Sequence, residues 1–138
     1  MRSAVYLDAS AIVKLVVAEP ESWALGDRLR GDVEAVTSEV SLTEVPRALR
    51  RIGLPPRAID RCADVLEHMR LLKADRRIFH RAAQMDPPSL RALDAIHLAS
   101  ALSIGDALGA FITYDHQQGT AAALTGLQVE TPGVGEPI

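Results

Sequence analysis

Four consecutive apolar or aromatic residues near the start of the chain, Ala4 to Leu7, run directly into an aspartate, Asp8. A short run of this kind with little polar alternation is typical of a strand buried on both faces, as in a parallel sheet covered by helices. In open α/β sheets, ligands bind in the crevice beyond the carboxyl ends of the strands. Asp8 therefore either occupies such a crevice or caps the helix predicted to follow.

Strand-like segments alternate with helical patterns along the rest of the chain. We expect further strands at 34–38, 70–73, 110–113 and 128–131. We expect helices at 11–18, 20–29, 38–51, 56–69, 75–85, 89–103 and 117–124, with Ser89 as the cap of the sixth. This alternation predicts one domain, residues 1–138, in which helices cover both faces of a parallel sheet.

Composition restricts the class of protein further. A chain of 138 residues with 48% hydrophobic residues can bury a core without a disulfide or a structural metal. Cys62 is the only cysteine, which excludes an intrachain disulfide or thiolate zinc site and fits a cytoplasmic protein. The apolar N-terminal segment is interrupted by Asp8 and Lys14, so we expect neither a signal peptide nor a membrane span.

The formal net charge of −3 conceals an uneven distribution. Residues 45–81 contain ten basic and four acidic residues, whereas the remainder contains five basic and fourteen acidic ones. A basic surface beside an acidic centre suits a polyanion held near a bound cation. The alternative is an ordinary solvated helical face rich in arginine.

Four acids stand at positions that call for an explanation. Asp8 and Asp115 each follow a strand, whereas Glu44 and Asp94 lie in apolar helical surroundings. Each also has a local explanation: Ser41 and Glu44 match a capping box, Asp94 can favour the helix dipole or pair with Arg91, and Asp115 can be a turn residue. Asp94 is predicted to lie about one turn into its helix, beyond the capping positions.

Together the four acids favour a shared cation, because clustered carboxylates repel one another and lose hydration. Oxygen ligands without paired cysteine or histidine favour Mg²⁺ or Mn²⁺ over zinc.

The motifs that contain these acids resemble those of PIN-domain ribonucleases, in particular the VapC toxins of VapBC toxin–antitoxin pairs. The matching segments are Leu7-Asp8-Ala9-Ser10, Glu44, Leu93-Asp94-Ala95-Ile96-His97-Leu98-Ala99 and Thr113-Tyr114-Asp115. The resemblance implies a three-layer α/β/α sandwich with a central, mostly parallel sheet of four to five strands. It also implies metal-dependent cleavage of RNA, homodimers, and a cognate antitoxin that covers the acidic site.

The resemblance also implies roles for the four acids. Asp8 and Asp94 would be the principal ligands of Mg²⁺ or Mn²⁺, with Glu44 and Asp115 binding directly or through water. Family members often have Asp-x-x-Phe at the last motif, whereas here Asp115 is followed by His116, Gln117 and Gln118. The hypothesis is metal-assisted hydrolysis of an RNA phosphodiester by these four catalytic carboxylates.

Several neighbours of the acids are candidates for supporting roles. Ser10 and Thr113 either hold the ligand carboxylates or cap local backbone, and we favour a packed or supporting histidine over an acid–base catalyst for His97. The arginines that could contact phosphates are Arg47, Arg50, Arg51 and Arg91. Leu25 is expected in the core, whereas Trp23 either packs there or lines a groove for a partner helix.

Other classes fit less well. A phospho-accepting receiver domain needs an acidic pair after the first strand and a late lysine, but Asp8 is followed by Ala9-Ser10 and the only lysines are Lys14 and Lys73. An aspartyl phosphatase needs Asp-x-Asp at the same place. A catalytically silent PIN-like domain that binds RNA or protein is the remaining alternative.

Overall fold

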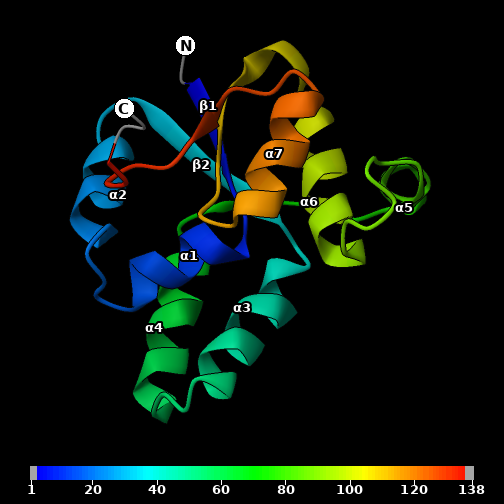
Figure 1. The fold of residues 1–138 in the computed structure, drawn as a ribbon. Helices are drawn as coiled ribbons and strands as arrows, with labels where there is room; N and C mark the ends of the chain where they lie inside the picture. Colours follow the sequence, from blue (N-terminus) through cyan, green and yellow to red (C-terminus); the bar gives the residue numbers. More distant parts are fainter. Residues whose placement is uncertain (1–2, 136–138) are drawn as a thin grey trace.

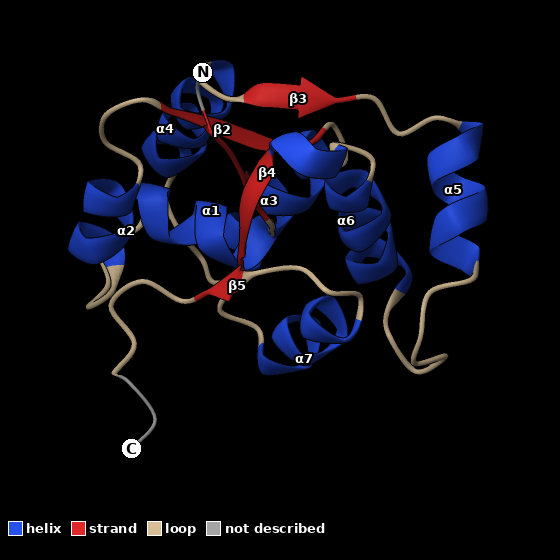
Figure 2. Ribbon diagram, turned by 90° about the horizontal axis from the view of Figure 1, so that it is seen from above, coloured by secondary structure: helices blue, strands red, loops and turns tan. Residues whose placement is uncertain are grey.

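A five-stranded parallel sheet forms the centre of the computed structural model, which describes residues 3–135. The strands are β1 (Ser3–Leu7), β2 (Val33–Ser38), β3 (Arg70–Leu72), β4 (Leu108–Ile112) and β5 (Val129–Glu130). Their order in the sheet is β3-β2-β1-β4-β5, and every neighbouring pair is parallel. The carboxyl ends of all five strands therefore point toward one edge, with β1 in the middle (Figures 1 and 2).

Helices cover both faces of this sheet. They are α1 (Ala9–Val16), α2 (Ser22–Arg28), α3 (Ser41–Arg51), α4 (Pro56–Glu67), α5 (Arg76–Ala83), α6 (Ala92–Leu102) and α7 (His116–Leu124), with a short 3₁₀ helix at Gly105–Ala107. Helices α1 to α4 pack on one face, α6 and α7 on the other, and α5 lies against α6 (Figures 1 and 2). The prediction of helical layers around a parallel sheet is confirmed.

The two faces of the sheet are both apolar because side chains alternate along each strand. In β1, Val5 and Leu7 join the core beneath α1 to α4, whereas Ala4 and Tyr6 join the core beneath α6 and α7. Leu25 of α2 is fully buried, as predicted. Trp23 is instead 73% exposed, so it does not pack in the core of this chain.

The prediction that Ser89 caps the sixth helix is wrong. Helix α6 begins at Ala92, and Ser89 lies in a turn that the Leu90 amide closes by donating to the Pro87 carbonyl. The two prolines of Asp86-Pro87-Pro88 keep this segment out of the helix, because proline restricts the residue before it and cannot donate a hydrogen bond. As a consequence, Asp94 lies in the first turn of α6 and not one turn further along.

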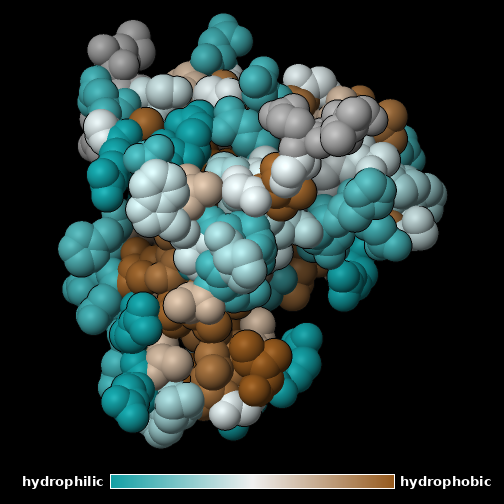
Figure 3. All heavy atoms as spheres, turned by 60° about the vertical axis from the view of Figure 1, so that its left-hand side comes forward, coloured by the Kyte–Doolittle hydropathy of each residue, from teal (hydrophilic) through white to brown (hydrophobic). Residues whose placement is uncertain are grey.

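The exposed surface is mixed. On the face shown in Figure 3, hydrophilic residues predominate above and hydrophobic residues gather toward the lower end. Within residues 3–135, no helix combines the length and the hydropathy that a transmembrane segment requires.

Replacing Leu49 with alanine should destabilise the fold by about 2–5 kcal/mol, because the fully buried Leu49 side chain fastens α3 to the core it shares with α1 and α4. The matched control is Leu42→Ala on the same helix, where the leucine is 51% exposed and the change should stay within about 0.5 kcal/mol. Denaturant unfolding followed by circular dichroism measures both values, and equal effects would contradict the proposed anchoring of α3.

Candidate functional site

A pocket with a volume of about 430 Å³ opens at the carboxyl edge of the sheet. All four predicted acids line it, and two arginines contribute to its wall: Asp8, Glu44, Asp94, Asp115, Arg51 and Arg91. Asp8 and Asp115 follow the adjacent strands β1 and β4, whereas Glu44 and Asp94 come from the first turns of α3 and α6. The fold thus brings together acids that are up to 107 positions apart in the chain.

Asp8 is almost completely buried and has three hydrogen-bond donors. Its carboxylate accepts from Ser10 Oγ at 2.6 Å, from Thr113 Oγ1 at 2.5 Å and from the Ala11 amide at 3.1 Å. Burial raises the pKa of Asp8, although the bonds from the two hydroxyls and the amide oppose this rise. Both readings of Asp8 therefore hold, since it caps α1 and lines the pocket as well.

The two hydroxyls that hold Asp8 also organise the backbone beside it. Ser10 Oγ accepts from the Tyr114 amide at 2.9 Å, and Thr113 Oγ1 accepts from the Asp115 amide at 3.1 Å. These bonds tie the start of α1 to the loop after β4. The two alternatives for Ser10 and Thr113, carboxylate support and backbone capping, therefore apply together.

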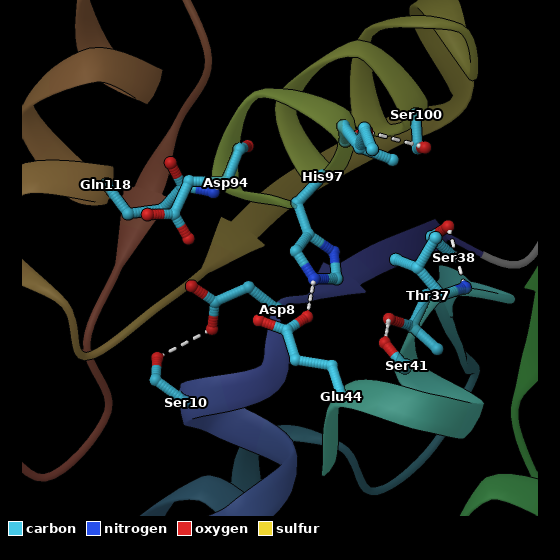
Figure 4. Close-up of polar contacts among 12 residues, drawn as sticks. Asp8, Ser10, Thr37, Ser38, Ser41, Glu44, Asp94, His97, Ser100 and Gln118 are labelled. Atoms are coloured by element: carbon cyan, nitrogen blue, oxygen red, sulfur yellow. Dashed lines mark hydrogen bonds and ion pairs between the residues drawn. The ribbon is translucent and has the colours of Figure 1, made fainter. Parts of the chain in front are cut away.

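Glu44 lies at the end of a buried hydrogen-bond chain. Its Oε1 atom is 2.7 Å from Nε2 of His97, and Nδ1 of His97 is 2.7 Å from the Tyr6 hydroxyl (Figure 4 shows the Glu44–His97 bond). Burial raises the pKa of Tyr6, so its hydroxyl stays protonated and can donate to Nδ1. Nε2 of His97 is the ring nitrogen that faces Glu44, so the imidazole can donate to that carboxylate through this atom.

The capping-box interpretation of Glu44 is wrong. The residue before α3 is Val40, whose apolar side chain cannot cap the helix, and the Ser41 hydroxyl is 2.8 Å from that of Thr37. Ser41 is drawn inward by this buried contact and therefore does not bond to the helix amides. The prediction of a packed, supporting His97 agrees with its burial and with its two partners.

Arg91 bridges the other two acids at the mouth of the pocket. Its guanidinium lies 3.4 Å from Asp115 Oδ2 and 3.6 Å from Asp94 Oδ2, while most of its side chain is exposed. Asp115 also caps α7 by accepting from the Gln118 amide at 3.1 Å. Arg91 is thus an internal countercharge for two carboxylates that would otherwise repel each other.

The electrostatic environment of Asp94 shows that the four acids act on one another. Burial raises the pKa of Asp94 most, the negative charge of Asp115 adds to the rise, and Asp8 and Glu44 contribute less. Arg91 opposes this shift but does not cancel it. Ionising all four carboxylates therefore costs free energy in the absence of a further cation.

Gln118 is a residue of the site that the sequence analysis did not single out. Its side chain is fully buried, and Nε2 donates to the Asp94 carbonyl at 3.0 Å. Its Oε1 atom has no hydrogen-bond partner among the residues that the structure describes. The sequence does carry a signal for this residue. Gln118 stands three positions after Asp115, where the family pattern Asp-x-x-Phe has a phenylalanine.

The donor set suits a hard divalent cation, since it consists of carboxylates with hydroxyl support and no thiolate. Across residues 3–135, no three Asp, Glu, His or Cys side chains already stand close enough to hold one ion. Each acid is turned instead toward a partner in the protein, as Figure 4 shows for Asp8 and Glu44. The four acids therefore fit a divalent cation by the chemistry of their oxygen atoms and by lining one pocket, and their roles as ligands stay a prediction.

In the metal-free protein, Asp94→Asn should raise thermal stability at pH 7. The folded state raises the pKa of Asp94 above its value in the unfolded chain, so ionisation in the folded state lowers stability. This penalty is absent below the unfolded pKa of about 3.9, grows as the pH rises toward the folded pKa, and is constant above it.

The gain in Tm should therefore be present at pH 7 and shrink toward pH 4 when unfolding is measured in EDTA. Asp60→Asn, which changes an exposed aspartate of α4, should leave Tm unaltered at both pH values. A variant at position 94 that melts below the wild type at pH 7 would refute the electrostatic argument.

Comparisons with known proteins identify the family of this chain. Residues 5–124 match the PIN domain family. Ribonuclease VapC46 of Mycobacterium tuberculosis is 45% identical over 130 residues, which cover 94% of this chain and 98% of that protein.

Two solved structures share the fold. One is VapC20 of Mycobacterium tuberculosis, a sarcin-ricin loop cleaving toxin, with a TM-score of 0.71 at 18% identity over 93% of this chain and 99% of that one. The other is a toxin–antitoxin complex from Klebsiella pneumoniae, with a TM-score of 0.67 at 21% identity over 94% of this chain and 98% of that one. The family match and the similarity to VapC46 together show that the chain belongs to the PIN-domain family, among the VapC ribonucleases.

Proposed function

We propose that this protein is the toxin of a toxin–antitoxin pair and hydrolyses RNA phosphodiester bonds as an Mg²⁺- or Mn²⁺-dependent endoribonuclease. The observation that carries the proposal is the convergence of Asp8, Glu44, Asp94 and Asp115 on one pocket. Burial and mutual repulsion make this cluster unfavourable by itself, which is the condition under which a divalent cation binds well.

The four acids divide the work of holding the cation. Asp8 and Asp94 would be the principal ligands, and Glu44 and Asp115 would complete the site. The cation would supply Lewis-acid chemistry, by which water becomes a nucleophile at neutral pH and charge on the phosphate is stabilised. Ser10 and Thr113 fix the orientation of Asp8, and Arg91 holds Asp115 at the mouth of the pocket.

His97 acts as a positioning residue for Glu44. It is fully buried and both ring nitrogens have partners, so it does not reach the substrate. Its contribution is to keep the Glu44 carboxylate oriented toward the pocket, much as supporting hydrogen bonds orient metal ligands in other proteins.

We further propose a cognate antitoxin and a homodimer as partners. The solved Klebsiella pneumoniae structure is a toxin–antitoxin complex of the same fold. An antitoxin that covers the mouth of the pocket would keep RNA from the four acids.

The test is cleavage of RNA by the purified protein with Mg²⁺ or Mn²⁺, and again after addition of EDTA. Asp8→Asn and Asp94→Asn should each lose more activity than the 10- to 100-fold, roughly, that removal of a supporting partner costs. Thr113→Val, which removes one hydroxyl that bonds to Asp8, should fall within that smaller range.

The exposed Asp60→Asn should cleave like the wild type, and circular dichroism checks that every variant is folded. Cleavage that persists in EDTA, or in either aspartate variant of the pocket, would reject the mechanism. Binding of RNA without any cleavage under all conditions would instead favour the catalytically silent module.

A further inference from the structure

A second groove adjoins the acidic pocket. It has a volume of about 330 Å³ and is lined by Val40, Thr43, Glu44, Arg47, Arg51 and Leu93. Three of these residues, Glu44, Arg51 and Leu93, also line the acidic pocket. The two cavities are therefore adjacent, and a polymer bound in one would pass close to the other. We refer to this second cavity as the flanking groove.

One side of the flanking groove is cationic. Glu44, Arg47 and Arg51 follow one another at spacings of three and four residues, which places them in one row along α3. Arg47 and Arg51 are exposed, and within residues 3–135 neither forms an ion pair or a side-chain hydrogen bond. The neighbouring acid, Glu44, bonds to His97 and to neither arginine.

The other side of the flanking groove is apolar. Leu93 of α6 is 42% exposed although it stands beside four carboxylates, and Val40 lies before the start of α3. An anion alone would not explain an apolar wall at this place. A nucleotide would, because its phosphate pairs with arginine while its base packs against apolar side chains and guanidinium planes.

We propose that the flanking groove holds the nucleotide next to the scissile phosphate in a single-stranded RNA segment, with Arg47 and Arg51 on its phosphate and Leu93 against its base. This inference rests on the proposed function, since it takes the acidic pocket to be the place of cleavage. Acidic protein segments would also satisfy the two arginines, but they leave the apolar wall and the adjacent acidic pocket without an explanation.

The test measures binding of a fluorescent single-stranded RNA oligonucleotide in the cleavage-deficient Asp8→Asn background. The target variant is Arg47→Ala/Arg51→Ala. Its matched control is Arg57→Ala/Arg61→Ala, which removes the same charge from two exposed arginines of α4 that line neither cavity. Fluorescence anisotropy over a series of salt concentrations gives the dissociation constant and its salt dependence.

The target variant should bind RNA at least about tenfold more weakly than the control, because it loses two charge-assisted contacts. The slope of log K against log salt should fall by about 1.4, since each phosphate contact on a single strand contributes about 0.7. In the otherwise wild-type enzyme the same pair of substitutions should raise KM for RNA, because it weakens binding of the substrate.

Equal affinities and salt slopes for target and control would overturn the proposal. So would a target variant that binds RNA normally but loses affinity for a polyglutamate peptide, because the groove would then be a protein-docking surface. Binding in the Asp8→Asn background does not depend on cleavage. Failure of metal-dependent hydrolysis would therefore reject the proposed function, whereas an unchanged salt slope in an active enzyme would reject the flanking groove alone.

Discussion

The repulsion among four carboxylates in one half-enclosed pocket is the constraint on which the rest of the site depends. Asp8 is nearly buried, and the pKa of Asp94 is raised by burial and by the other acids. Each acid has a partner within the protein, and Asp94 and Asp115 share theirs. Hydroxyls hold Asp8, an imidazole holds Glu44, and Arg91 lies between Asp94 and Asp115. These partners keep the acids near one another without cancelling their charge.

The parallel sheet is what allows such a cluster to exist. Because β1 and β4 are adjacent and parallel, the residues that follow them emerge side by side at one edge. The two helical layers then meet beyond this edge, with Glu44 on α3 from one layer and Asp94 on α6 from the other. The Glu44–His97 bond joins the layers where no strand separates them.

The features that could be predicted from the sequence are those that short segments determine. The apolar run before Asp8 predicts a buried parallel strand, and the motifs around the four acids predict the family. The sequence pattern misplaces the start of α6. Ser89 is a good capping residue, but it lies in a turn that is closed by the hydrogen bond from the Leu90 amide to the Pro87 carbonyl. The partners of Glu44 and Gln118 lie 53 and 24 positions away, so local patterns could not reveal them.

The chain of hydrogen bonds from Glu44 through His97 ends on Tyr6, a residue of the central strand that stacks on Phe111. Phe111 carries no charge and belongs to the hydrophobic core. The identity of Phe111 therefore bears on the site, because its ring packs on the Tyr6 ring at the far end of this chain of hydrogen bonds. A substitution at Phe111 that preserves volume and melting temperature can still tilt the stacked rings. Such a tilt would displace His97 and, with it, the Glu44 carboxylate that lines the pocket.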